Sequence, residues 1–254
     1  MKTSRRALLL REMDLSPVWR FRIGKRDGEP QVPEIHQPAQ GSTALPQTVS
    51  PGRAEAAAMS EPGDREARIL RMDWQQLKEA VSGCRSCALC KTRTNTVFGV
   101  GDEHADWLLV GEAPGAEEDA RGEPFVGQAG RLLDNMLASV GLKRGTSVYI
   151  ANVLKCRPPG NRNPGPAEVA QCSAYLQRQI QLIQPKLIIA MGRFAAQTLL
   201  ETDATIGSLR GRVHRYRGVP LIVSYHPAYL LRSLTEKAKA WEDLCFARRT
   251  MAGL

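Results

Sequence analysis

The sequence contains no long hydrophobic run. No stretch among its 254 residues approaches the ~20 apolar residues that span a bilayer. The longest apolar run near the start, residues 7–10, is too short for the core of a signal peptide, and Arg11 and Glu12 follow it directly. We therefore expect a cytoplasmic protein without a membrane segment, whose six cysteines do not form a disulfide framework.

Acidic residues are in the minority. The chain has 35 Lys and Arg against 26 Asp and Glu, which gives a net charge of +9. A cytoplasmic protein this basic often acts on a polyanion, nucleic acid above all. The alternative is that the arginine content follows the base composition of the genome, and charge alone leaves both open.

Aromatic residues are missing from residues 27–63, which hold six of the sixteen prolines. Such a segment buries too little apolar surface to offset its chain entropy, which predicts a disordered linker over residues 27–72. In residues 1–26 a short helical pattern precedes Trp19 and Phe21 in a basic context. This pattern predicts a docking peptide, with a helix packed on the main domain as the alternative.

Short apolar runs alternate with helical patterns through residues 73–254. Repeated β–α units predict an α/β protein, a three-layer α/β/α sandwich with a central, mostly parallel four-stranded sheet, plus the disordered N-terminal arm. Ligands of such folds bind at the carboxyl ends of the strands. We expect strands at 107–111, 148–153, 187–191 and 221–224, and helices at 73–81, 129–140, 167–183, 194–200 and 235–251.

Five of the six cysteines fall into two groups. Cys84, Cys87 and Cys90 are separated by two residues each, and Cys156 and Cys172 by fifteen. A C-x2-C pair places two thiolates within reach of one metal centre, and a strand end and the next helix can bring the second pair there. Four thiolates suit structural zinc or an iron–sulfur cluster, and the spacing leaves both open.

Polar and aromatic residues gather at the expected strand ends. The segment GEAPG, followed by AEED, carries carboxylates where a phosphate-binding loop would carry lysine. Phe125 lies in a loop between glycines, and Asn152 and His226 follow the second and fourth strands. Each alone is more often structural, but an aromatic platform, an amide and an imidazole in one pocket suit a flat, hydrogen-bonding heterocycle.

Taken together, these segments resemble a known family. GEAPGAEED, GEPFVGQAG, NVLKCRPPGNRNP and HPAYLLR, with the cysteine set, are similar to the family 4 uracil-DNA glycosylases, bacterial and archaeal repair enzymes with a [4Fe-4S] cluster. The resemblance runs from about Trp74 to the C-terminus. It implies that residues 73–254 hydrolyse the N-glycosidic bond of uracil flipped out of DNA and so initiate base excision repair. It also implies a monomer in the bacterial cytoplasm, associated with the nucleoid.

The resemblance implies roles for individual residues. Uracil would stack on Phe125 and pair with the Asn152 amide, while His226 would stabilise negative charge on the uracil O2 atom. Glu112, or alternatively Glu118, would stabilise the sugar cation or orient water. The resemblance also implies that Gly111 and Ala113 lie around the base. The implied DNA contacts are Arg157, Arg162, Leu230, Leu231 and Arg232, and further candidate phosphate contacts are Arg210, Arg212, Arg215 and Arg217. The implied cluster ligands are Cys84, Cys87, Cys156 and Cys172, and Cys90 is a possible substitute.

Two other classes of function fit part of the pattern. A related branch of the superfamily binds uracil-DNA covalently through a histidine in a basic KRRIH insertion, but this chain has GNRNPGP there, without histidine. A metal-bearing nucleic-acid adaptor without catalysis would make Phe125, Asn152 and His226 coincidental.

The N-terminal peptide SRRALLLREMDLSPVWRFR loosely resembles a separate protein, the psi subunit of bacterial DNA polymerase III, in its clamp-loader-binding N-terminus. This resemblance implies a contact between residues 1–26 and the replication clamp loader, which would raise the local concentration of the enzyme at the fork.

Overall fold

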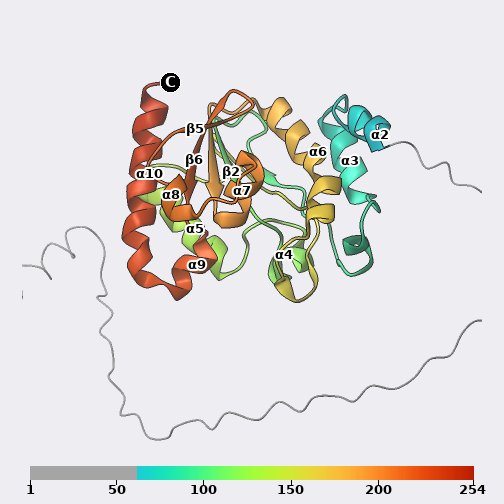
Figure 1. Cartoon of the computed structure of the whole chain (residues 1–254), viewed down its shortest axis with the longest axis horizontal. Coiled ribbons are helices and arrows are strands. Elements are labelled where there is room, and N and C mark those ends of the chain that lie inside the picture. Colours follow the sequence, from blue (N-terminus) through green and yellow to red (C-terminus); the bar gives the residue numbers. More distant parts are fainter. Residues whose placement is uncertain (1–61) are drawn as a thin grey trace, which may run out of the picture. The chain divides into compact units, whose positions relative to one another are not determined.

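A six-stranded sheet forms the centre of the computed structural model, which describes residues 62–254 (Figure 1). The strand order is β1-β3-β2-β4-β6-β5. The four inner strands pair in parallel, and the two edge strands pair antiparallel to their neighbours. The strands are β1 (Val100–Gly101), β2 (Trp107–Gly111), β3 (Val148–Asn152), β4 (Leu187–Met191), β5 (His214–Tyr216) and β6 (Val219–Ser224).

The four strands expected from the sequence are the four parallel ones. Strands β2 and β4 have the predicted bounds, β3 ends one residue earlier, and β6 begins two residues earlier. The mostly parallel sheet is therefore confirmed. The count of four was two strands short because β1 and β5 span only two and three partly exposed residues, which produce no apolar pattern.

Helices cover both faces of the sheet and make it the middle of three layers. Helices α6 and α7 pack on one face, where Leu108 of β2 is fully buried. Helices α5 and α10 pack on the other face, against Leu109. Because both faces are covered, the inner strands are almost continuously apolar. The helices are α2 (Pro62–Ile69), α3 (Trp74–Ser82), α4 (Ala116–Arg121), α5 (Gln128–Ser139), α6 (Pro166–Ile183), α7 (Arg193–Leu200), α8 (Ile206–Leu209), α9 (Pro227–Arg232) and α10 (Lys237–Ala252), with 3-10 turns at Ala88–Lys91, Pro159–Asn161 and Leu234–Glu236.

Helix α2 lies within the stretch predicted as linker. Its last residue, Ile69, is 2% exposed and packs with Leu77 of α3 and Tyr175 of α6. Asp73 then caps α3 by accepting a hydrogen bond from the Gln76 amide at 2.8 Å. Residues 62–72 thus belong to the folded part of the chain, which corrects the predicted boundary at residue 73. The docking peptide at 1–26 and the linker up to residue 61 lie outside the described residues.

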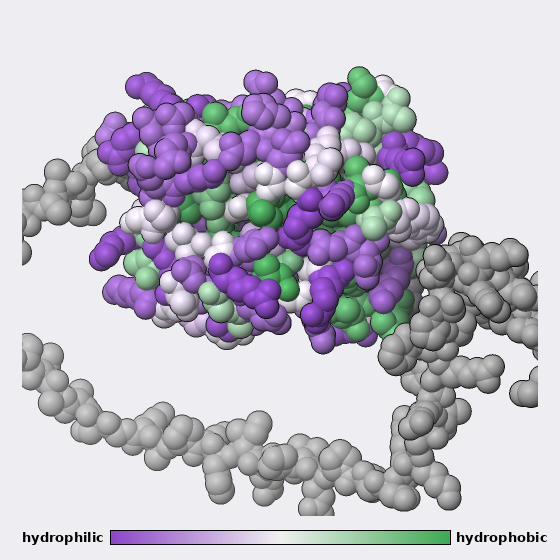
Figure 2. All heavy atoms as spheres, turned by 180° about the vertical axis from the view of Figure 1, so that it is seen from behind, coloured by the Kyte–Doolittle hydropathy of each residue, from purple (hydrophilic) through white to green (hydrophobic). Residues whose placement is uncertain are grey.

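The surface is largely polar on the side shown in Figure 2. Hydrophilic side chains predominate there, and hydrophobic ones form smaller groups between them, as is usual for a surface in contact with water. Within residues 62–254, no helix has the length and apolar character needed to cross a membrane.

The register of the parallel strands sets the position of the candidate site. Gly111 ends β2 directly opposite Asn152, which ends β3. Met191 of β4 stands opposite Ser224 of β6. The loops that begin at these four residues therefore emerge at the same edge of the sheet.

The packing of α2 gives a first prediction. Ile69→Ala should lower the free energy of unfolding by about 2–4 kcal/mol, because it removes a buried aliphatic side chain next to α3 and α6. Urea denaturation followed by circular dichroism measures this change. The exposed neighbour Arg68, changed to Ala, is the control and should stay within about 0.5 kcal/mol of wild type. Equal stability of the two variants would contradict the assignment of α2 to the folded domain.

Candidate active site

A cavity of about 680 Å³ opens at the carboxyl ends of the parallel strands. Loops that follow β2, β3, β4 and β6 contribute to its lining, as expected for an α/β sheet. The size suits a small ligand such as a nucleobase with part of its sugar. The predicted site residues in the lining are Glu112, Ala113, Glu118, Phe125, Asn152, Arg162, His226 and Arg232.

Phe125 and His226 form an aromatic pair in this cavity. Their ring centroids are 5.3 Å apart and their planes are inclined by 29°. Phe125 adopts a left-handed backbone with φ of 55°, which is strained for a bulky residue. The Arg144 guanidinium stabilises this conformation by donating to the carbonyl oxygens of Pro124 and Phe125, each at 2.9 Å. A Cβ at position 130 would overlap the Phe125 carbonyl group, so Gly130 lets helix α5 approach the loop.

Glu118 fastens the same loop. One carboxylate oxygen accepts from the Gly115 amide at 3.1 Å, and the other accepts from the Val126 and Gly127 amides at 3.1 and 3.4 Å. The carboxylate therefore joins the turn after β2 to the segment that carries Phe125. These three contacts favour a structural role for Glu118 over the catalytic alternative.

The hydrogen bonds of His226 indicate the tautomer of its ring. Its Nδ1 atom accepts from the Ala228 amide at 3.2 Å and caps helix α9, so the proton of a neutral ring lies on Nε2. Removal from water lowers the pKa of His226 to about 4; the charge of Glu118 opposes this shift and that of Arg232 adds to it. At neutral pH the site thus presents a neutral imidazole whose Nε2–H is a donor.

Asn152 presents an unpaired acceptor. The residue is 2% exposed, and its Oδ1 atom has no hydrogen-bond partner within the described part of the chain. Unpaired buried polar atoms are rare because they cost about 1–3 kcal/mol each. A Cβ at Gly111 would overlap Oδ1 and crowd the Phe125 ring. The glycine therefore lets the amide and the aromatic ring meet at the cavity wall.

Glu112 is the carboxylate left without a structural contact. Within residues 62–254 its side chain makes no hydrogen bond, although it lines the cavity. Burial raises its pKa, and the positive charge of Arg193 opposes that rise. This environment leaves its oxygens available to a ligand or to water.

The predicted DNA contacts differ in whether their side chains can reach a partner outside the protein. Leu230 is 1% exposed and faces the core, whereas Leu231 is 38% exposed, so only the latter can reach a partner. Arg162 lies at the rim and pairs with Glu168 at 2.6 Å. Arg157 donates to the Asn161 side chain at 2.7 Å instead of lining the cavity.

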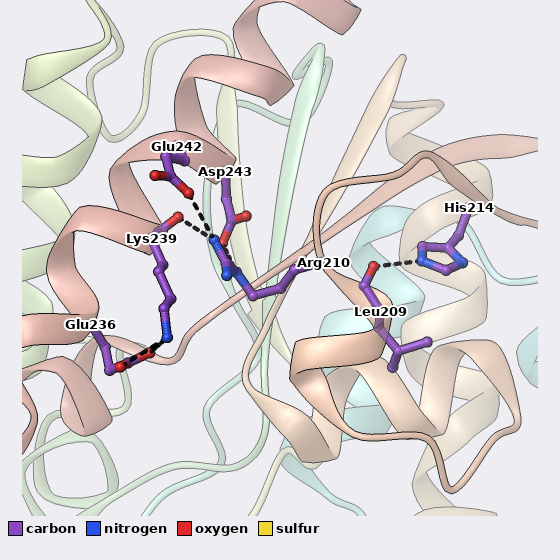
Figure 3. Close-up of polar contacts among 7 residues, drawn as sticks. All are labelled: Leu209, Arg210, His214, Glu236, Lys239, Glu242 and Asp243. Carbon is purple, nitrogen blue, oxygen red and sulfur yellow. Dashed lines mark hydrogen bonds and ion pairs between the residues drawn. The ribbon is translucent and has the colours of Figure 1, made fainter.

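Arg210 is already held by protein groups. Its guanidinium pairs with Asp243 at 2.7 Å and with Glu242 at 3.8 Å (Figure 3). It also stacks over Tyr225, 5.0 Å from the ring centroid. Two carboxylates and a carbonyl oxygen of Lys239 occupy its donors, which argues against the predicted phosphate contact. Its role is to join α10 to the segment that carries Tyr225.

The cysteines of both groups line a second, small cavity between the 3-10 turn after α3 and the start of α6. Within the described residues no three His, Cys, Asp or Glu side chains are close enough to hold a single metal ion. Arg93 donates to the Cys156 sulfur at 2.9 Å and to the Cys84 carbonyl at 2.8 Å. The lining cysteines are Cys84, Cys87, Cys90, Cys156 and Cys172.

These surroundings favour sulfur in its anionic form at one position. Burial acts to raise the pKa of Cys84, but hydrogen bonds from Ser86 and Tyr175 and the charge of Arg65 outweigh it, so that the pKa is lowered. Burial raises the pKa of Cys172 to about 12, although the charge of Lys155 opposes this. Arg65, Arg93 and Lys155 thus surround the thiols with positive charge.

Three functional candidates were missed from the sequence: Arg144, Arg93 and Lys155. Arg144 follows α5 in an exposed turn, where an arginine carries no recognisable signal. Arg93 and Lys155 were detectable only as basic residues near cysteines, three residues after Cys90 and one before Cys156. The sequence did not show that Lys155 would be buried.

Known proteins resemble this chain over the same region. The profile of the Uracil DNA glycosylase superfamily matches residues 98–245, which is more than half of the chain. The Type-4 uracil-DNA glycosylase of Archaeoglobus fulgidus is 52% identical over 159 residues, covering 59% of this chain and 79% of that protein. The Type-4 enzyme of Pyrobaculum aerophilum is 42% identical over 181 residues, covering 68% and 92%.

A more distant relative is the Type-5 uracil-DNA glycosylase of the same Pyrobaculum, 34% identical over 146 residues and 64% of its length. The higher identity and coverage of the Type-4 proteins confirm the resemblance noted in the sequence. The chain therefore belongs to the uracil DNA glycosylase superfamily, among the Type-4 uracil-DNA glycosylases.

Proposed function

We propose that this protein is a uracil-DNA glycosylase, a hydrolase that removes uracil from DNA and initiates base excision repair. The observation that carries the proposal is the unpaired Oδ1 of Asn152 at the wall of a cavity that also contains the Phe125–His226 pair. Membership of the Type-4 enzymes supports the same reaction.

Asn152 selects the base. Its Oδ1 accepts the N3–H of uracil and its Nδ2 donates to uracil O4, while the ring stacks on Phe125. Cytosine has an acceptor at N3 and a donor at C4, so it would leave both groups of the buried amide unpaired. Such mismatches reject a wrong ligand strongly, because buried polar groups lose water without gaining a partner.

His226 stabilises the leaving group. As the bond between uracil N1 and sugar C1′ breaks, its electron pair moves onto the base, and the neutral imidazole donates Nε2–H to the developing charge on O2. Glu112 lines the cavity, where its carboxylate stabilises the sugar cation or orients the water that attacks C1′. The water oxygen bonds to C1′, and its proton passes to the carboxylate or solvent.

Basic residues at the rim bind the DNA. Arg162, Arg193 and Arg232 line the mouth of the cavity, where a flipped nucleotide brings its flanking phosphates. Leu231, exposed on helix α9, fills the space that the base leaves in the stack.

The cysteine cavity is the proposed place of a [4Fe-4S] cluster, held by Cys84, Cys87, Cys156 and Cys172. The donor set fits the group: thiols from the segment after α3 and from the loop and helix after β3 line one cavity, and cationic side chains surround them. Within the described residues the thiols do not converge on a single metal ion. An iron–sulfur cluster is the other group that four thiolates would hold. A cluster held by these residues would cross-link the segment after α3 to the loop after β3 and to helix α6.

Further features stay predictions. We expect residues 1–26 to contact the replication clamp loader, and we expect the enzyme to act as a monomer at the bacterial nucleoid. These residues lie outside the described part of the chain.

To test the glycosylase proposal, an oligonucleotide with a single uracil is incubated with the enzyme under single-turnover conditions and then treated with alkali, which cleaves the strand where a base is missing. The same DNA with thymine in place of uracil is treated in parallel. We expect strand breaks at uracil only, and a loss of about 10²–10³-fold in rate for His226→Ala. Wild-type rate should fall as pH drops toward 4, because protonation of His226 Nδ1 removes the acceptor that holds the ring to the Ala228 amide. His214→Ala, at a histidine bonded to the Leu209 carbonyl outside the cavity, is the control.

No break at uracil from folded wild-type protein would contradict the proposal and favour the non-catalytic binder or adaptor. An unchanged rate in His226→Ala would instead remove this histidine from the mechanism while leaving the activity in place.

The position of Gly111 gives a further prediction. Gly111→Ala should lower kcat/KM for uracil excision by at least about tenfold without unfolding the protein, since the added methyl group displaces Asn152 and Phe125. Gly207→Ala, where a Cβ meets nothing closer than 4.0 Å, is the matched control and should keep full activity. Wild-type kinetics in Gly111→Ala would refute the close packing of amide and ring.

The cluster proposal is tested by iron and sulfide analysis of protein purified without oxygen. Cys156→Ala should lose most of its iron and become less stable, whereas Cys90→Ala, at the neighbouring cysteine outside the ligand set, should keep both. Equal iron in the two variants would contradict the assignment of ligands, and iron-free wild-type protein would contradict the cluster itself.

A further inference from the structure

Lys155 is a fully buried lysine. The residue is 1% exposed, and its ammonium donates to the Asn152 carbonyl oxygen at 2.9 Å and to the Gln179 side-chain oxygen at 2.6 Å. Within residues 62–254 no carboxylate lies within ion-pair distance of it. A buried cation with two neutral acceptors is strongly unfavourable unless a nearby anion compensates it.

The nearest anions available are thiolates. Lys155 precedes Cys156 in the chain, its own backbone amide donates to the Cys172 sulfur at 3.4 Å, and it lines the cysteine cavity. Cysteines bind metal as thiolates, so a loaded site places negative charge beside the ammonium. Arg93, on the Cys156 sulfur, is a second cation at the same centre, but it is partly exposed.

The same ammonium reaches the active site. Its acceptor, the carbonyl of Asn152, belongs to the residue whose side chain forms the wall of the base pocket. Its other acceptor, Gln179, is anchored by donating to the Phe98 carbonyl at 3.0 Å. Lys155 therefore joins the loop that carries Cys156 to the end of strand β3.

We propose that Lys155 is the internal counter-charge of the cysteine-bound cluster and, through it, a positioning residue for Asn152. This inference rests on the proposed cluster. When the cluster is present, its negative charge stabilises the buried ammonium, and the ammonium holds the backbone of Asn152 in place. When the cluster is lost, the ammonium is uncompensated, which favours movement of residues 152–156.

The experiment compares Lys155→Met, Lys155→Gln and Lys155→Arg with wild type, all as cluster-loaded protein. Lys91→Met is the matched control, because Lys91 lies beside Cys90 but is exposed. The readouts are the rate of iron release to a chelator, followed by the loss of visible absorbance, the midpoint potential of the cluster, and KM and kcat for a uracil oligonucleotide.

If the charge is what matters, both neutral variants release iron about tenfold faster or more, in line with substitutions next to metal ligands. Their midpoint potential shifts to more negative values, because a cation no longer favours the reduced, more negative cluster. Weaker positioning of Asn152 raises KM or lowers kcat in the same variants. Lys155→Arg and Lys91→Met should release iron at a rate near that of the wild type.

Wild-type release and potential in Lys155→Gln, which keeps a hydrogen-bond donor but no charge, would overturn the inference. If neither neutral variant accumulates as folded protein, the folding of Lys155→Arg with its cluster decides the question. A folded, cluster-loaded Lys155→Arg supports the requirement for charge, whereas misfolding of all three variants overturns the inference. Iron-free wild-type protein would mark the failure of the cluster proposal, and loaded but inactive wild-type protein that of the glycosylase proposal.

Discussion

The register between β2 and β3 is the constraint on which the rest of the site depends. It places Gly111, which has no side chain, opposite Asn152 at the sheet edge. The amide can then lie close to the Phe125 ring, and His226 from the end of β6 stacks with the same ring. A slip of one residue would turn the Asn152 side chain to the other face of the sheet, because strand side chains alternate.

Several contacts hold this arrangement from outside the pocket. Glu118 and Arg144 both fix the strained loop at Phe125, one by accepting from backbone amides and the other by donating to carbonyls. Lys155 and Arg93 hold the loop after β3 toward the cysteines. Of these four side chains only Glu118 lines the cavity. Their contacts fix the backbone around Phe125 and Asn152, which lowers the reorganisation that catalysis would otherwise require.

The sequence predicted the parallel strands and the residues at their ends because both depend on local patterns. Continuous apolar runs mark strands buried on two faces, and the polar residues that interrupt them at Asn152 and His226 stand out. Strands β1 and β5 were missed because short edge strands leave no pattern, and α2 because Ile69 is its one clearly buried side chain among the described residues.

Other differences between the structure and what the sequence predicted arise from contacts that connect distant residues. Nothing in the order Leu230–Leu231 shows which leucine faces the core, since that depends on the rotation of α9. The carboxylates of Glu112 and Glu118 look equivalent until backbone amides occupy the second. The burial of Lys155 depends on Gln179 in a helix 24 residues later. Such roles follow from tertiary structure and not from residue type.

The central claim is that the free Oδ1 atom of Asn152 receives the imide N–H of uracil. Product inhibition tests it directly: free uracil and 3-methyluracil, which lacks that N–H, are compared as inhibitors of excision by the cluster-loaded enzyme. The account predicts inhibition by uracil and at least about tenfold weaker inhibition by 3-methyluracil, since the methyl group leaves Oδ1 unpaired and crowds it. Equal inhibition by the two compounds would contradict it.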